Sequence, residues 1–305
     1  DANILFVGAK ECMEEKRVPA AGYEIKCVGS SYGLVRGLDP KSIANNIKGV
    51  FRTVEAINDC KKILKEFQPD VIMGTGGFAC FPALMAGSMM KIPTCVHESN
   101  ALPGLTTRML ASRVDRTLIC FPESAAQYKE PKKLIAVGMP IRQEFVRPDR
   151  LKARKELGIG EEELLVVSAF GSLGATRMNE ITAELFALEK RDGFPFRHIH
   201  ATGKWGWEWM ADRALGLGVD LSKCPSIDMR EYIYNMSTVM AAADVFISRS
   251  GASTCNEIAA TGLPTILIPS PNVTDNHQEK NARVLVDKGG AVMILEADSS
   301  AEAVY

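Results

Sequence analysis

Small and polar residues that could bind an anion and neighbouring hydroxyl groups are concentrated in residues 245–285. Glu257 offers a carboxylate that could bind the hydroxyls of a ribose, and His277 and Gln278 begin an expected helix. A helix start binds anions because its unpaired N–H groups carry a partial positive charge. Two simpler explanations stay open. Thr254 and Glu257 have the spacing of a capping box, and polar residues commonly open a helix after a loop.

The pattern around these residues is strand, tight turn and helix, occurring twice. An apolar run at 245–248 leads through a turn of small residues at 249–252 into a helix over 253–261, which Gly262 ends. A second strand at 264–268 leads through a loop into the next helix, so both helix starts meet at the carboxyl edge of one parallel sheet. The chain has no Asp-x-Asp pair and no acidic cluster at metal-ligand spacing. The pattern therefore favours a nucleoside-diphosphate site that needs neither a metal ion nor another cofactor.

The first half of the chain has its own acid–base candidates, in the loop after an expected strand at 94–97. Glu98 could take a proton from an attacking hydroxyl group, and Asn100 could hydrogen-bond a sugar. In the simpler alternative, Asn100 makes a turn and Glu98 caps the helix that follows Pro103.

Two further glycine-rich turns follow expected strands, at residues 74–77 and 171–175. In the second turn, Ser172 could donate a hydrogen bond to a phosphate. One such turn is weak evidence, because any tight turn with positive φ also needs glycine. Three turns at the carboxyl ends of strands together favour a phosphate-binding edge.

Composition sets the broad class. The 305 residues suggest about two domains, and 46% hydrophobic with 24% charged residues is ordinary for a globular protein. A net charge of −1 argues against nucleic-acid binding. The eight cysteines lack C-x-x-C spacing, which indicates reduced thiols and a cytosolic protein. His198 and His200 lie in a strand-like run, where a structural role is favoured over a metal site. We expect neither a membrane span nor a signal peptide.

Strand and helix patterns alternate along the whole chain, which predicts parallel sheets. The charged, proline-containing segment 138–157 is the expected join, so we predict domains at 1–145 and 146–305. Residues 72–99 repeat the order of strand, glycine turn, helix, strand and polar loop found at 246–271. This repeat predicts a two-substrate protein in which each half binds one ligand. The expected strands are 4–7, 23–28, 71–73, 94–97, 117–120, 134–137, 164–169, 198–201, 245–248, 265–268 and 291–294.

An amphipathic helix is expected around residues 43–64. Its apolar stripe either packs on the sheet or partly faces a membrane, and core packing is favoured. The expected stripe is Ile43, Ile47, Val50, Val54, Ile57 and Leu64, with Lys48, Arg52, Lys61 and Lys62 nearby. Trp205, Trp207 and Trp209 do not share a helical face, and we assign them no chemistry.

Six motifs together resemble those of the MurG family, the peptidoglycan N-acetylglucosaminyltransferases. In family order and spacing they are PDVIMGTGGF, PTCVHESNALPGLTTR, VGMPIR, GSLGATRMNE, RSGASTCNEIAATGLPTILIPSP and DNHQEKNA. The resemblance covers nearly all of the chain and implies the GT-B fold, in which two doubly wound, Rossmann-like parallel-sheet domains face a central cleft. It implies an inverting transfer of N-acetylglucosamine from UDP-GlcNAc to lipid I, MurNAc-pentapeptide-diphospho-undecaprenol, which forms lipid II in peptidoglycan synthesis.

The resemblance also implies a role for each site residue. The donor's diphosphate would lie near Ser172 and Arg142. Its uracil would contact the backbone at Ile233, and its ribose would bind Glu257. The other donor residues would be Asn100, Ala252, Ser253, Thr254, Cys255, Asn256, His277 and Gln278, and the acceptor's diphosphate would lie by Gly76, Gly77 and Phe78.

The sequence departs from the family at a few positions. Met139 stands where the family commonly has Asn, Phe78 where Tyr is frequent, and His277 where some members have Gln. The family's first strand, its glycine-rich loop with a histidine, and its closing helices are expected to fall outside these residues. The first choice for a base is Glu98, the second is His97, and the third is that family histidine.

The resemblance implies partners as well. The enzyme would act at the cytoplasmic face of the bacterial membrane as a peripheral protein, together with other cell-wall synthesis proteins. Two other functions stay open: another GT-B UDP-sugar enzyme, such as a glycolipid synthase or an epimerase, and a non-catalytic sugar-nucleotide binding protein.

Overall fold

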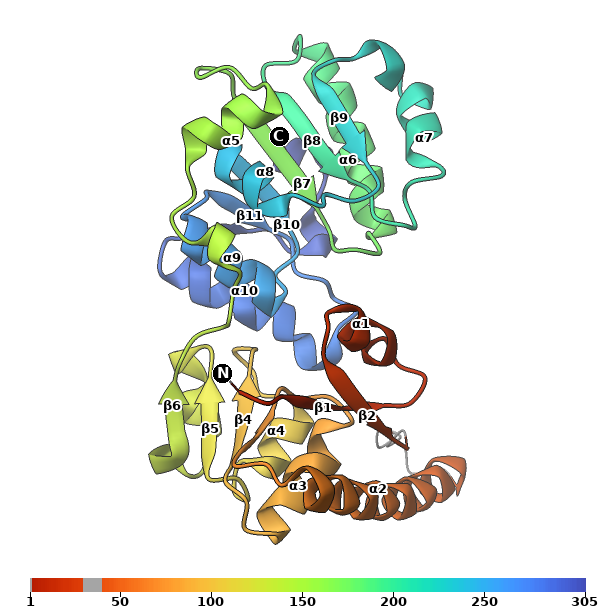
Figure 1. The fold of residues 1–305 in the computed structure, drawn as a ribbon. Coiled ribbons are helices and arrows are strands. Elements are labelled where there is room, and N and C mark those ends of the chain that lie inside the picture. Colours follow the sequence, from red (N-terminus) through yellow and green to blue (C-terminus); the bar gives the residue numbers. More distant parts are fainter. Residues whose placement is uncertain (1, 30–39) are drawn as a thin grey trace. The chain divides into compact units, whose positions relative to one another are not determined.

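A computed structural model of the chain describes residues 2–29 and 40–305, with side chains from residue 49 onward in the second range. The chain divides into two compact units, unit 1 at Asp1–Gly138 and unit 2 at Met139–Tyr305 (Figure 1). This division lies a few residues before the join at 145 and 146 that the sequence suggests. Each unit is described by itself.

Unit 1 is built from parallel strands and covering helices, as the sequence predicts. Its described strands form two sheets rather than one: β1 pairs with β2, and the other four lie in the order β3-β4-β5-β6. The strands are β1 (Leu5–Ala9), β2 (Glu24–Val28), β3 (Ile72–Gly74), β4 (Thr94–Glu98), β5 (Arg116–Ile119) and β6 (Leu134–Ala136). The helices are α1 (Glu14–Ala20), α2 (Pro40–Phe67), α3 (Cys80–Met89) and α4 (Leu105–Leu110), with 3-10 turns η1 (Pro122–Gln127) and η2 (Pro131–Lys133).

Helix α2 packs through a stripe that overlaps the expected one only in part, at Ile57 and Leu64. Ala56, Cys60 and Leu64 are buried against α3, whereas Val50 and Val54 are 56% and 52% exposed. The small side chains of Ala56 and Cys60 let the helix backbone approach α3 closely, which turns the larger valines outward. The expected stripe is therefore wrong at those two valines. Ile43, Ile47 and Lys48 lie outside the residues whose side chains are described.

Unit 2 contains one six-stranded parallel sheet in the order β12-β11-β10-β7-β8-β9. Its strands are β7 (Leu165–Ala169), β8 (Arg197–Ala201), β9 (Ile227–Arg230), β10 (Val245–Ser248), β11 (Thr265–Leu267) and β12 (Val292–Met293). Its α-helices are α5 (Arg150–Leu157), α6 (Thr176–Arg191), α7 (Met210–Gly216), α8 (Met236–Ala242), α9 (Ala252–Thr261), α10 (His277–Asp287) and α11 (Ala301–Val304). The 3-10 turns are η3 (Gln143–Phe145), η4 (Leu221–Lys223), η5 (Thr274–Asn276) and η6 (Glu296–Asp298). Strand β9 was not predicted, because its short IDMR segment lies at the sheet edge and contains two charged residues.

Helices cover both faces of the unit 2 sheet (Figure 1), and alternating strand side chains are buried beneath them. Phe246 and Leu267 point to the face covered by α5, α8, α9 and α10. Ile247 and Ile266 point to the opposite face, against α6 and α11. This alternation follows from the period of two in a strand. Because the strands are parallel, the loops after them all lie at one carboxyl edge of the sheet.

Candidate functional site

Helix α9 begins at the carboxyl end of β10. Gly251 precedes it with extended backbone (φ −62°, ψ 151°) and makes no side-chain cap, and Gly262 ends it in the left-handed region at φ +68°. The N–H groups of Ala252, Ser253 and Thr254 therefore form an uncapped first turn. An uncapped helix start at the edge of a parallel sheet can bind an anion.

The capping box proposed for Thr254 and Glu257 is wrong. A capping box needs Thr254 to precede the first helical residue, but α9 already begins at Ala252. Glu257 therefore lies in the second turn of α9, where it has no capping role.

Glu257 is a half-buried carboxylate near a positive charge. Burial raises its pKa above the ordinary value of 4.5, and the nearby Arg142 guanidinium opposes that rise. No side chain or backbone group among the described residues hydrogen-bonds to it. Arg142 lies just before η3, 5.0 Å from the Phe145 ring centre and 3.7 Å from the Glu144 carboxylate. Glu257 thus has room to bind hydroxyl groups of a ligand.

Hydrogen bonds join the loop before α9 to the first turns of α10. Ser250 Oγ donates to the carbonyl of Gln278 at 2.8 Å, and Asn281 Nδ2 donates to the carbonyl of Ser250 at 3.2 Å. Arg249 donates to the carbonyls at the end of β11, including that of Ile268 at 3.0 Å, and pairs with Glu296. Arg249, Ser250 and Asn281 were not named from the sequence. Their only signal there is their place in the RSGAS and DNHQEKNA motifs.

The expected sugar-binding pair also shapes its own loop. Gln278 Oε1 accepts a hydrogen bond from the Ser270 N–H at 2.9 Å, and His277 Nδ1 donates to the carbonyl of Thr274 at 2.9 Å. Asp275 and Asn276, which lie between Thr274 and His277, adopt positive φ of 54° and 52°. The amide nitrogen of Gln278 is thus oriented by the bond that its oxygen makes.

The loop after β7 lies beside α9, because Ala169 at the end of β7 is in register with Ser248 at the end of β10. This loop carries Ser172, which is exposed. Gly171 and Gly174 have φ of +93° and +80°, and the Gly174 N–H donates to the Gly171 carbonyl at 3.0 Å. The tight turn presents the Ser172 hydroxyl at the same edge as the α9 start.

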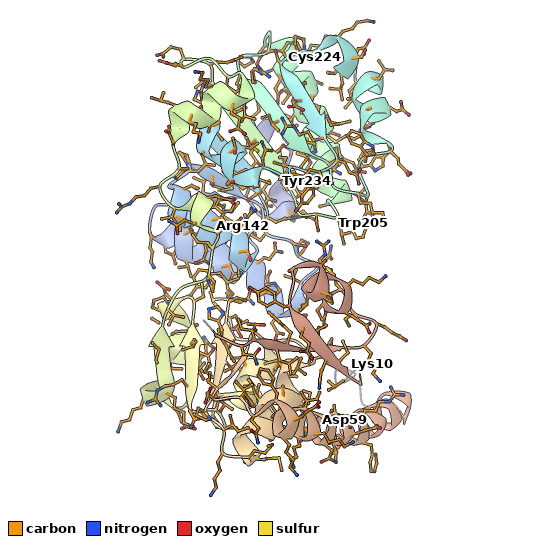
Figure 2. The ribbon with its side chains drawn as sticks, viewed as in Figure 1. Lys10, Asp59, Arg142, Trp205, Cys224 and Tyr234 are labelled. Carbon is orange, nitrogen blue, oxygen red and sulfur yellow. The ribbon has the colours of Figure 1, made fainter. Side chains whose placement is uncertain are left out.

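A hollow of about 490 Å³ within unit 2 is lined mainly by residues of α5 and α8. Arg142 and Tyr234, both labelled in Figure 2, line it together with Asn235. Ile233, the expected uracil contact, is buried at 2% exposure beside Tyr234. Unit 2 therefore gathers most of the expected donor residues: Arg142, Ser172, Ile233, Ala252, Ser253, Thr254, Cys255, Asn256, Glu257, His277 and Gln278.

Glu98 and His97 in unit 1 are almost fully buried, at 5% and 4% exposure. The Glu98 carboxylate accepts hydrogen bonds from the N–H of Asn100 at 3.0 Å, from Asn100 Nδ2 at 3.2 Å and from the N–H of Gly104 at 3.0 Å. His97 Nε2 donates to the carbonyl of Gly138 at 2.8 Å. Since Gly104 precedes α4, Glu98 binds the start of that helix. This is the capping role that the sequence offered as the alternative to a base.

The glycine turn after β3 is open. Gly76 and Gly77 have φ of +87° and +81°, and Phe78 is 57% exposed. Gly74 lies just before them, where a Cβ would overlap the Cys80 and Leu84 side chains of α3. The turn thus lies tightly over the start of α3, with its glycine backbone accessible.

Within residues 2–29 and 40–305, no three His, Cys, Asp or Glu side chains form a metal-binding group. No helix in the described part of the chain is long and apolar enough to span a membrane.

Comparison with known proteins gives the same account of both units. The model of the glycosyltransferase family 28 N-terminal domain matches residues 1–119, and that of the family 28 C-terminal domain matches residues 165–304. The chain is 40% identical over 305 residues to a UDP-N-acetylglucosamine--N-acetylmuramyl-(pentapeptide) pyrophosphoryl-undecaprenol N-acetylglucosamine transferase of Acetivibrio thermocellus, covering all of this chain and 80% of that one. It is 35% identical over 302 residues to the transferase of the same name from Bacillus cytotoxicus, covering 99% and 80%.

Solved structures confirm the fold. The crystal structure of MurG from Acinetobacter baumannii matches with a TM-score of 0.73 at 22% identity, over 98% of this chain and 79% of that one. A UDP-GlcNAc 2-epimerase from Neisseria meningitidis, solved with UDP-GlcNAc, matches with a TM-score of 0.59 at 12% identity, over 98% and 88%. The GT-B prediction is therefore confirmed. With relatives at this identity over its whole length, the chain belongs to the UDP-N-acetylglucosamine--N-acetylmuramyl-(pentapeptide) pyrophosphoryl-undecaprenol N-acetylglucosamine transferases, a family built from glycosyltransferase family 28 domains.

Proposed function

We propose that this protein transfers N-acetylglucosamine from UDP-GlcNAc to lipid I and forms lipid II, with inversion at the sugar's anomeric carbon. Family membership supports both substrates, because the relatives' name contains the donor sugar and the undecaprenol-linked acceptor. In the structure, the proposal rests chiefly on the open carboxylate of Glu257, which lies near Arg142 in a unit whose uncapped α9 start can bind a diphosphate.

The donor would bind to unit 2 through groups of different chemistry. Glu257 would accept hydrogen bonds from the ribose hydroxyls, and the backbone at Ile233 would contact the uracil. The first turn of α9, from Ala252 to Asn256, and the Ser172 hydroxyl would bind the diphosphate. Gln278, with His277 beside it, would hold the sugar.

The same anion-binding groups would promote the reaction. As the bond to the anomeric carbon breaks, negative charge grows on the departing UDP. Fixed N–H dipoles at the α9 start and the Arg142 guanidinium would stabilise that charge more than the charge of the intact donor, which lowers the barrier.

For the proton of the acceptor hydroxyl, Glu98 stays the proposed base, with His97 second. A carboxylate has about four acceptor sites, and the described residues use three of them at Glu98, which leaves a site among these residues for a substrate. Asn100 would contact the sugar, and the glycine turn at Gly76 and Gly77 with Phe78 would bind the acceptor's diphosphate.

One assay separates the proposed transfer from its alternatives. The protein is incubated with UDP-GlcNAc, with and without a soluble lipid I analogue, and UDP and lipid II are measured. Transfer predicts equal amounts of UDP and lipid II, both dependent on the acceptor. Epimerisation of UDP-GlcNAc without acceptor would identify an epimerase, and binding without any conversion would identify a binding protein.

We also propose that unit 1 associates peripherally with the cytoplasmic face of the membrane through α2. Val50, Phe51 and Val54 form one exposed apolar surface, in which Phe51 is 72% exposed. Lys62 and Lys65 are exposed on the same helix. An apolar surface with a few basic residues gives weak, salt-sensitive binding to anionic lipid.

Sedimentation with anionic vesicles tests this surface. We expect binding at low salt that Phe51→Glu weakens and that salt reverses. Leu151→Glu is the matched control, because Leu151 is similarly exposed, at 66%, but lies on α5 of unit 2. Equal binding of the two variants would contradict the proposal for α2.

A further inference from the structure

A continuous series of buried polar side chains runs through unit 2 beneath the loop that carries Ser172. Its five members are each fully buried, at 0% exposure, and each contacts the next. In order they are Glu189, His198, Ser168, His200 and Asn179. Unpaired polar groups are costly in such surroundings, so each hydrogen bond of the series constrains the next.

The direction of the first bonds follows from Asn179. A backbone carbonyl can only accept, so the Asn179 atom 2.8 Å from the Thr202 carbonyl is the donor Nδ2. Asn179 Oδ1 then faces His200 Nε2 at 3.2 Å and must accept a hydrogen from it. Burial lowers the pKa of His200 well below 6.5, so the ring is neutral and its Nδ1 has no hydrogen. His200 Nδ1 therefore accepts from the Ser168 hydroxyl at 2.6 Å.

The remaining bonds follow in turn. Because Ser168 uses its one hydrogen on His200, its oxygen accepts from His198 Nε2 at 2.7 Å. His198 Nδ1 and Glu189 Oε1, 2.7 Å apart, then share one proton. The series has one self-consistent arrangement. Rotating the Asn179 amide by half a turn would set oxygen against oxygen at Thr202 and hydrogen against hydrogen at His200.

Asn179 thereby fixes a second loop, residues 202–206, against the Ser172 loop. The Thr202 carbonyl lies directly on Gly174, where a Cβ would overlap it, and a Cβ on Gly206 would overlap Asn179 Nδ2. The Trp205 N–H donates to the Leu173 carbonyl at 3.0 Å, and the Lys204 N–H to that of Ser172 at 3.4 Å. Trp205 is labelled in Figure 2. The backbone from Ser172 to Gly174 is thus held by the Thr202 loop.

We propose that Asn179 is a positioning residue of the donor site, which sets the backbone of the Ser172 loop for the donor's diphosphate through its bond to the Thr202 carbonyl. The inference rests on the proposed function, because it takes the Ser172 loop as the diphosphate contact. Asn179 itself is buried and touches no ligand.

This role predicts an effect on the diphosphate that spares the nucleoside. The Thr202 carbonyl contacts the Ser172 loop, whereas Ile233 and Glu257 lie on other segments of unit 2. Loss of the Asn179 amide should therefore weaken the binding of UDP more than the binding of uridine. A general loss of stability would weaken both by the same factor.

The test measures dissociation constants of UDP and uridine for the wild type, Asn179→Ala and Asn179→Asp. We expect UDP binding to weaken about 10-fold, or about 1.4 kcal/mol, and uridine binding to change less than about twofold. Thr182→Val is the matched control, because Thr182 is buried in the same helix and loses a comparable bond, to the Met178 carbonyl at 2.8 Å. Equal losses for UDP and uridine in the Asn179 variants would overturn the inference.

A second measurement does not depend on UDP. Hydrogen exchange of the Trp205 and Gly174 amides should accelerate in Asn179→Ala and stay at the wild-type rate in Thr182→Val. Unchanged exchange in Asn179→Ala would overturn the inference whatever the protein binds. If the wild type bound UDP no more tightly than uridine while exchange still accelerated, the donor site would be wrong and the loop-positioning role of Asn179 would stand.

Discussion

Glu98 and Glu257 are carboxylates of the two units, each beside a helix at the carboxyl edge of a parallel sheet, but their surroundings differ. Glu98 is 5% exposed, and its oxygens accept three hydrogen bonds from Asn100 and Gly104. Glu257 is half-buried, and none of the described residues donates a hydrogen bond to its carboxylate. Burial raises the pKa of Glu257, with only the Arg142 charge in opposition.

The difference separates a carboxylate that stabilises a loop from one that is available to a ligand. The donors around Glu98 are backbone and side-chain N–H groups of its own loop, so the free protein already gains their energy. At Glu257 the free-energy cost of partial burial is offset only when a ligand supplies hydrogen-bond donors. A carboxylate left in that condition is more typical of a binding site than of a structural tie.

The largest effect is expected from removing the carboxylate of Glu98. Glu98→Ala leaves the N–H groups of Asn100 and Gly104 without their acceptor, in a loop that is only partly buried. An unpaired buried group costs about 1–3 kcal/mol, and water can reach these groups in part, so the free energy of unfolding should fall by about 2 kcal/mol. Urea unfolding of wild type and variant measures this loss.

The isosteric variant Glu98→Gln tests the base. It keeps an acceptor oxygen but replaces the other by an amide that cannot accept a proton. Loss of transfer with wild-type stability would identify Glu98 as the base. Loss of stability with transfer retained in the folded fraction would leave Glu98 with its loop role alone.

Glu257 should show the opposite behaviour. Glu257→Gln should weaken UDP-GlcNAc binding by about 1–3 kcal/mol, because a charged acceptor for the ribose hydroxyls is lost. The melting temperature of the free protein should not fall. Calorimetric titration gives the affinity and a thermal scan gives the stability.

A modified ligand identifies the group that Glu257 binds. If its partner is the ribose 2′-hydroxyl, the 2′-deoxy form of UDP should bind wild type and Glu257→Gln with similar affinity. An undiminished loss with that ligand would move the contact to another hydroxyl. Wild-type affinity of Glu257→Gln for UDP-GlcNAc itself would remove Glu257 from the donor site.

Strand positions were largely predictable because an apolar run of four or five residues fixes where a buried strand lies. Val245–Ser248 was predicted with its observed bounds. The start of α9 was displaced by one residue, because the sequence pattern gave weight to the polar Ser253 and Thr254. The turn before the helix is held by the hydrogen bonds that Ser250 makes with Gln278 and Asn281, and the observed start places Glu257 in the second turn of α9.

The buried series behind the Ser172 loop was only half predictable. A structural role for His198 and His200 follows from their strand-like run, and both lie in a buried network. Their partners Glu189, Ser168 and Asn179 are many residues away along the chain. Only the packing of α6 on β7 and β8 brings them together, which single-sequence spacing cannot show.

The smallest expected effect is on stability. The free energy of unfolding of Glu257→Gln should differ from that of the wild type by an amount that depends on pH. Because burial raises the folded-state pKa of Glu257 above 4.5, its contribution to stability is full below 4.5 and is lost as pH rises through the folded pKa. The neutral glutamine has no such loss. We therefore expect equal free energies of unfolding near pH 4 and a more stable variant at pH 7, by less than about 1 kcal/mol since solvent screens a half-exposed group. Saturating UDP-GlcNAc should reverse the order at pH 7, because the ligand then supplies donors to the ionised carboxylate. A stability difference that did not change between pH 4 and pH 7 would show that Glu257 is already paired in the free protein, and would remove its contrast with Glu98.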